Sequence, residues 1–174
     1  IGAAFDVGTA FYLNEPQVAA AGDGSFFVLW KGSFPQAARV DGPGVVVPLP
    51  AVSVTGLYPK IAADADANFI VVWTNSDGSG IGVTAQRFDR DGNALAAPFQ
   101  VNTYTTGGQD YPWVAMAPSG AFAITWEVSD DGDDYGIAAR LYDAKGTPVT
   151  DDFAVNTYTT NSQSQPTIAM DAAG

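Results

Sequence analysis

The sequence predicts an all-β protein built from tandem four-stranded blades of the β-propeller type. Three observations predict this fold class. A segment recurs along the 174-residue chain at spacings of 43, 53 and 54 residues, each full copy contains four strand-like runs, and the most apolar of these runs are hydrophobic on both faces. Stacked four-stranded repeats are typical of propellers, whereas a β-sandwich, the alternative, does not explain a complete four-strand repeat.

Each copy of the repeat begins at a proline, and the complete copies carry a tryptophan 14 positions later. Three complete copies and one partial copy start at Pro16, Pro59, Pro112 and Pro166. The later parts of two copies match as well, because residues 82–112 and 136–166 share 13 of 31 positions, including the unbroken run Asn-Thr-Tyr-Thr-Thr. Such a match does not arise by chance, so the chain is an internal repeat.

The second copy shows the four expected strands in order, at residues 60–63, 69–73, 83–88 and 99–101. A short turn rich in Asp and Asn joins the first strand to the second. The third strand ends in Asp-x-x-Gly, which indicates a hairpin leading to the fourth. No segment of useful length has the periodicity of a helix, which makes the prediction all-β.

Both faces of the second strand in this copy are apolar. Phe69, Val71 and Trp73 would point one way, whereas Ile70 and Val72 would point the other. A sheet with one face in water should instead alternate apolar and polar residues. We therefore expect this strand to be covered by sheets on both sides, as a strand within a propeller blade is.

The repeat divides the chain into five parts. These are residues 1–15 as the last strand of a preceding blade, 16–58 as a shortened first blade, 59–111 as a second blade, 112–165 as a third blade, and 166–174 as the first strand of a following blade. Three blades are fewer than the roughly four of a closed propeller. We expect a segment of a longer polypeptide, with other blades or domains of that polypeptide as its partners.

Composition excludes several classes of function. The chain has 7 basic and 19 acidic residues, a net charge of −12, and no histidine or cysteine. A chain with this much negative charge is not expected to bind nucleic acid or an anionic membrane, because both are negatively charged. No run reaches the roughly 18 apolar residues that membrane insertion requires. Ser-His-Asp catalysis, zinc sites with sulfur or imidazole ligands, and disulfides are excluded as well.

One face of the expected propeller is the candidate binding face. If the strands alternate in direction, the loops between second and third strands share a face with the crossings from one blade to the next. Most length variation between copies falls there, and variable polar loops on a rigid scaffold are typical of binding sites. Trp113 stands where the other copies have polar residues. The candidate ligand- or partner-binding residues are Tyr104, Gln109, Tyr111, Trp113, Tyr135 and Tyr158.

An acidic loop is the candidate metal site. It contains four carboxylates: Asp130, Asp131, Asp133 and Asp134. Oxygen ligands of this kind suit a hard cation such as Ca²⁺. The alternative is a solvated acidic loop, because the equivalent loop of the second copy, residues 76–79, lacks the cluster. Calcium is thus a candidate ion, and no other cofactor is predicted.

The repeat resembles a family of tandem repeats in large secreted or surface proteins of bacteria. The resemblance rests on the patterns P-x-(V/I)-A, F-x-(V/I)-x-W, G-(V/I)-x-A-x-x-(F/Y)-D and F-x-V-N-T-Y-T-T. The first copy departs from it, because it lacks the Asn-Thr-Tyr-Thr-Thr segment. The resemblance implies propeller blades that lie beside calcium-binding or adhesion modules and carry no common catalytic residues.

The resulting functional prediction is a non-catalytic structural or adhesive segment of a larger secreted or cell-surface bacterial protein. The chain is not expected to be an enzyme, and its expected location is extracellular. A protein or a glycan is the expected external partner. Two alternatives remain open: a carbohydrate-binding module, and the non-catalytic part of a polysaccharide-active enzyme.

Overall fold

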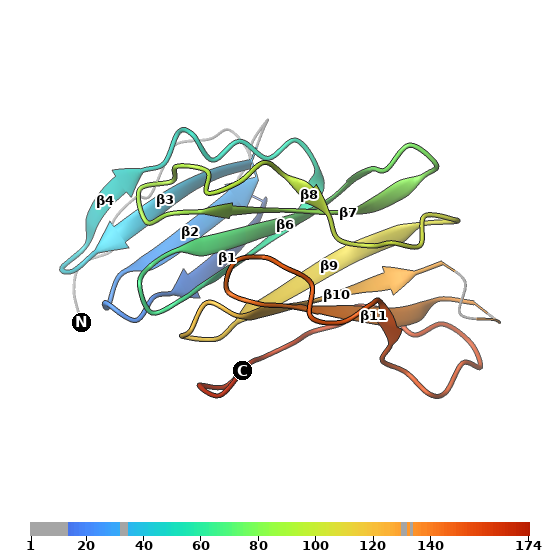
Figure 1. Cartoon of the computed structure of the whole chain (residues 1–174). Helices are drawn as coiled ribbons and strands as arrows, with labels where there is room; N and C mark the ends of the chain where they lie inside the picture. Colours follow the sequence, from blue (N-terminus) through green and yellow to red (C-terminus); the bar gives the residue numbers. More distant parts are fainter. Residues whose placement is uncertain (1–13, 32–34, 130–131, 133) are drawn as a thin grey trace.

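A computed structural model describes residues 14–31, 35–129, 132 and 134–174. The described residues form twelve strands in three antiparallel sheets of four, and they contain no helix. Within each sheet the strands follow one another in chain order. The prediction of an all-β chain of tandem four-stranded blades is confirmed, and the three blades make an incomplete propeller-like assembly (Figure 1).

The strands of each blade are short. The first blade contains β1 (Asn14–Ala20), β2 (Phe26–Lys31), β3 (Pro35–Asp41) and β4 (Val45–Pro48). The second contains β5 (Leu57–Ala63), β6 (Phe69–Ser76), β7 (Ile81–Phe88) and β8 (Phe99–Gln100). The third contains β9 (Gln109–Met116), β10 (Phe122–Val128), β11 (Gly136–Tyr142) and β12 (Phe153–Ala154). The first strands are neighbours, since β5 contacts both β1 and β9, so they form the inner edge of the fan of blades.

The core lies between the blades. Phe69 and Val71 of β6 pack against the first blade, where the rings of Phe27 and Phe69 have centroids 4.4 Å apart. Ile70 and Val72 on the other face of β6 pack against the third blade. The middle blade is therefore covered on both sides, as its apolar pattern predicts. Burial of these side chains against the neighbouring sheets holds the blades together, because apolar area removed from water is the main stabilising term.

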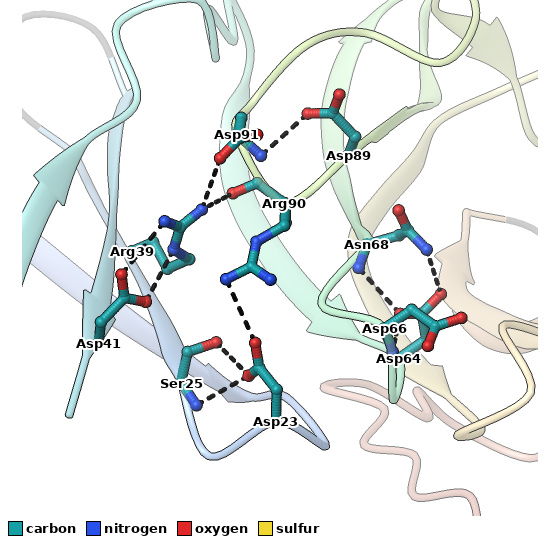
Figure 2. Close-up of polar contacts among 10 residues, drawn as sticks. All are labelled: Asp23, Ser25, Arg39, Asp41, Asp64, Asp66, Asn68, Asp89, Arg90 and Asp91. Carbon is teal, nitrogen blue, oxygen red and sulfur yellow. Dashed lines mark hydrogen bonds and ion pairs between the residues drawn. The ribbon is translucent and has the colours of Figure 1, made fainter.

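Aspartate side chains shape the turns at the end of the blades opposite the candidate binding face. Asp64 accepts hydrogen bonds from the backbone N–H groups of Asp66 and Asn68, at 2.9 and 2.8 Å. Asp89 accepts in the same way from Asp91 and from Asn93, both at 2.9 Å. Figure 2 shows several of these aspartates in their turns. Aspartate is suited to this role because its short carboxylate reaches backbone donors two to four residues ahead.

Arginines on the third strands connect one blade to the next. Arg39 of β3 donates to the backbone oxygen of Arg90 at 2.6 Å and to the Asp91 carboxylate at 2.8 Å (Figure 2). Arg87 of β7, at the equivalent position, donates to the backbone oxygens of two residues in the third blade at 2.6 and 2.9 Å. The third blade has Leu141 at this position. The inter-blade arginine is therefore a feature of the first two blades.

Candidate functional site

The first strands of the second and third blades begin with an unusual backbone. Tyr58, Tyr111 and Gln165 each precede a proline of the repeat, and their φ angles are 52°, 47° and 56°. The β5–β6 pairing shifts register at this point of the second blade. A positive φ is uncommon for any residue other than glycine, and for a bulky side chain it is a true outlier. Strain of this kind is often found at functional sites.

The bulged backbone brings two tyrosines together. The rings of Tyr58 and Tyr111 have centroids 4.3 Å apart, and the Tyr111 hydroxyl donates to that of Tyr58 at 3.4 Å. This hydrogen bond raises the pKa of Tyr111 to about 12. Next to them the ammonium of Lys60 lies 4.7 Å from the ring centroid of Trp113, a cation–π contact. These residues, with Gln165 and its neighbours, line a cavity of about 320 Å³, the axial cavity.

A second cavity of about 610 Å³ adjoins the axial cavity and shares Tyr111 and Gln165 with it. We call it the carboxylate cavity, because it contains Asp110 and Glu127. Its other lining residues come from the start of β7, from inter-strand loops and from blade crossings: Ile81, Gly108, Ser129, Tyr135, Ser162 and Ser164. The cavity therefore lies on the face where the sequence places the loops between second and third strands and the crossings.

Loops and crossings are hydrogen-bonded to each other on this face. Ser129, which follows β10, accepts from the backbone N–H of Gly108 in the crossing, at 2.7 Å. Ser79, in the loop after β6, donates to the backbone oxygen of Thr105 at 2.5 Å. The first of these contacts joins two residues of the wall of the carboxylate cavity, Gly108 and Ser129.

Glu127 and Asp110 are partners across neighbouring strands, since they pair in the β9–β10 register next to a shift between Thr125 and Glu127. Such a bulge re-aims a side chain. Glu127 is only 6% exposed. Burial raises the pKa of its carboxyl, and the negative charge of Asp110 raises it further, while a hydrogen bond from the backbone N–H of Gln165 acts in the opposite direction.

Two donors orient the Asp110 carboxylate. The hydroxyl of Thr74 on β6 donates to its Oδ1 at 2.6 Å, and the backbone N–H of Tyr111 donates to the same oxygen at 2.8 Å. Thr74 and Glu127 each directly follow the tryptophan of their copy. The same repeat position therefore provides Thr74, a hydrogen-bond donor to Asp110, in the second blade and the carboxyl group of Glu127 in the third.

The structure brings together three of the six candidate binding residues. Tyr111 and Tyr135 line the carboxylate cavity and are 40% and 44% exposed, and Trp113 lines the axial cavity. Tyr104 lines a different cavity, beside Phe153 in the third blade. Tyr158 is exposed and lines neither the axial nor the carboxylate cavity.

Gln109 is buried in a clamp that the Asn-Thr-Tyr-Thr-Thr run forms. Asn102 accepts from the backbone N–H of Val83 at 2.8 Å, and its amide donates to Gln109 at 3.0 Å. Asn156 and Gln163 make the same contacts in the next copy, with the amide pair again at 3.0 Å. The run thus fixes the crossing from one blade to the next.

The candidate calcium loop is mostly outside the described residues, which include Asp134 but not Asp130, Asp131 or Asp133. The Asp134 carboxylate accepts a hydrogen bond from the Ser162 hydroxyl. Among the described residues, no group of three or more carboxylates is placed to hold a metal ion. Calcium at this loop stays a prediction.

Sequence reasoning missed Asp110 and Glu127 as site residues. A signal was present, because Glu127 is one of two glutamates in the chain and stands where the other copies have Lys31 and Thr74. Asp110, two residues before its proline, stands where the second copy has Leu57. A comparison of copies for positions where one blade alone carries a carboxylate would have found both.

Three solved structures similar to this chain are all proteins of bacterial origin. GH43B of the Bacteroides ovatus xyloglucan PUL has a TM-score of 0.56 and 14% identity, over 86% of this chain and 30% of that one. An endo-arabinase from Bacteroides thetaiotaomicron VPI-5482 has a TM-score of 0.49 and 18% identity, over 82% and 61%. An alpha-L-arabinofuranosidase from Clostridium thermocellum ATCC 27405 has a TM-score of 0.49 and 13% identity, over 83% and 51%.

The chain thus spans 61% or less of the length of these structures. No protein-family model matches it, and neither does any curated protein sequence. The resemblance to bacterial tandem repeats is therefore confirmed only as to a propeller-type fold. None of the described residues belongs to a helix that is long and apolar enough to cross a membrane.

The likeness to GH43B contradicts two predictions: that the chain is a non-catalytic structural or adhesive segment, and that it is not an enzyme. It agrees better with the alternative of a part of a polysaccharide-active enzyme. The error has a physical reason. The recurring residues that carried the prediction build strands and turns, and residues that build a fold do not specify the chemistry mounted on it. What the likeness to GH43B shows is the fold: the three four-stranded sheets are blades of the propeller type.

Proposed function

We propose that the chain is part of a polysaccharide-active propeller enzyme and that the carboxylate cavity acts on a glycosidic bond. The observation that carries the proposal is the pair of Glu127 and Asp110, a buried carboxyl with a raised pKa beside a second carboxylate in an open cavity. Glycoside hydrolysis uses two carboxyl groups in different environments, one of them held in its protonated form.

Glu127 is the proton donor in this proposal. Its carboxyl would protonate the glycosidic oxygen as the bond to the anomeric carbon breaks, because burial raises its pKa and so favours the protonated form. The carboxylate of Asp110 would keep that pKa high and stabilise the positive charge that develops on the sugar ring in an oxocarbenium-like transition state. Water would then add to the anomeric carbon and give up a proton, which returns to the carboxylate of Glu127.

The remaining lining residues suit a sugar. The exposed rings of Tyr111 and Tyr135 offer flat apolar surfaces with a hydroxyl at the edge, and Ser162 and Ser164 add hydroxyl groups. GH43B, which has a TM-score of 0.56 to this chain, belongs to a xyloglucan PUL. Plant hemicellulose is therefore the substrate class that we propose. Because such polymers cannot enter a cell intact, we also propose an extracellular location.

The test is release of reducing sugar from xyloglucan, arabinoxylan and arabinan by the 174-residue chain. We expect activity that is lost in Glu127→Gln. Asp151→Asn is the matched control, since it removes an exposed carboxylate that lines neither cavity. A chain that cleaves none of these polymers, or a Glu127→Gln variant as active as the control, would refute the proposal.

A further inference from the structure

The axial cavity contains a positive charge in a strongly acidic protein. The chain has a net charge of −12, yet of the described residues that line the axial and carboxylate cavities only Lys60 is cationic. Lys60 lies on an inner strand, β5, and is half-buried. Its ammonium is held over the ring of Trp113 rather than extended into water.

The aromatic residues around Lys60 form a platform. The Trp113 ring is half-buried and carries the ammonium at 4.7 Å from its centroid, while Tyr58 and Tyr111, whose rings are tilted by 33° to each other, line the same cavity. A sugar ring packs its C–H face against aromatic rings and presents its polar substituents at the edge. A carboxylate at that edge would meet the ammonium, whose three N–H donors suit an anionic acceptor.

The axial cavity adjoins the carboxylate cavity. Tyr111 and Gln165 line both, and Asp110 directly precedes Tyr111. A sugar chain with one residue beside Glu127 would therefore place a neighbouring residue near Lys60. The two positions differ in charge: Asp110 and Glu127 disfavour an anionic sugar at one, whereas Lys60 favours it at the other.

We propose that the axial cavity is a subsite for a uronic acid, so that the substrate is an acidic hemicellulose in which a uronate lies next to the neutral residue at the carboxylates. This inference rests on the proposed function, because it places the uronate relative to the bond that Glu127 protonates. Lys60 is the specificity-determining residue, and Trp113, Tyr58 and Tyr111 hold the ring.

The test compares two probes: a xylo-oligosaccharide with one glucuronic acid substituent, and the same oligosaccharide without it. Binding is measured by calorimetry with the Glu127→Gln variant, which prevents cleavage. Hydrolysis is measured with the wild-type chain. We expect tenfold or tighter binding of the acidic probe. In the double variant with Lys60→Met this preference should disappear while the affinity for the neutral probe stays the same. Lys145→Met is the matched control, because Lys145 is an exposed lysine in the β11–β12 turn.

The outcomes separate the two proposals. If both probes bind equally and are cleaved, the uronate subsite is wrong and the proposed function stands. If the acidic probe binds through Lys60 but no substrate is cleaved, the subsite stands as a binding site and the hydrolytic proposal is wrong. If Lys60→Met weakens both probes equally, Lys60 supports the cavity rather than selecting a uronate, and the subsite is refuted.

Discussion

Replacement of Glu127 by glutamine tests the central assignment through two independent quantities. The variant keeps the shape of the side chain, and its amide oxygen can still accept the hydrogen bond that the Gln165 backbone donates at 2.6 Å. No stabilising hydrogen bond worth about 1 kcal/mol is therefore lost. The variant removes the carboxyl group of Glu127, which is the proposed proton donor and whose ionisation is disfavoured by burial.

The first quantity is the rate. General acid catalysis by a positioned side chain contributes roughly 10²–10⁴-fold, so kcat/KM should fall by that factor, which corresponds to about 3–5 kcal/mol of transition-state stabilisation. The pH profile should also lose its alkaline limb, because that limb reports deprotonation of the acid. Initial rates on xyloglucan between pH 4 and pH 9 measure both effects. A loss smaller than tenfold would rule out Glu127 as the proton donor.

The second quantity is stability against pH. Because the pKa of Glu127 is raised from 4.5 in the folded protein, the folded state binds the proton more tightly than the unfolded state. The contribution of this group is fully present below pH 4.5 and is lost as pH rises through the folded pKa. Glu127→Gln cannot ionise, so its stability relative to the wild type should increase over that range. Urea titrations at several pH values measure the difference, and parallel curves would contradict the raised pKa.

The remaining predictions concern the contacts between and within blades. Arg87→Met should lower the free energy of unfolding by about 1–3 kcal/mol, since it removes two hydrogen bonds to backbone oxygens of the next blade. Arg90→Met should lower it by less than about 1 kcal/mol, since the ion pair of Arg90 with Asp23 is exposed. Equal unfolding midpoints of the two variants in urea would contradict this order. Asn102→Ala should cost about 1–3 kcal/mol because Asn102 is buried and leaves a backbone N–H without its acceptor. Asn156→Ala should cost less because it is partly exposed, and thermal unfolding of the two variants side by side measures the difference.

Much of the fold could be predicted because its determinants are local or periodic. The proline-to-tryptophan spacing gives the repeat, and the two apolar faces of the strand that begins at Phe69 require a sheet on each side. The starts of the inner strands could not be predicted. The left-handed backbone at Tyr58 and Tyr111 and the register shifts depend on pairing between strands, and a sequence pattern does not specify a bulge of this kind.

The candidate site was only partly predictable, for a related reason. Tyr111 and Tyr135 could be found because aromatic residues on variable loops and crossings are typical of binding sites, and Trp113 because the other copies have polar residues at its position. Gln109 has the same polar character in the sequence, yet in the fold it is buried and held by Asn102. Only the register of the strands distinguishes a polar side chain that lines a cavity from one that completes a crossing.

The repeat itself separates the scaffold from the chemistry. Residues that serve the fold recur between blades, as the core phenylalanines do in all three and the clamp asparagines do in the second and third, because a recurring contact needs a recurring side chain. A residue that serves a single site is needed only once. Asp110, Trp113 and Glu127 each depart from the other copies, and in the structure they line two adjoining cavities at the inner edge of one blade. Nothing in the packing of the blades requires residues that differ from the other copies to lie together. Their clustering at these two cavities therefore supports the proposal that a ligand binds there.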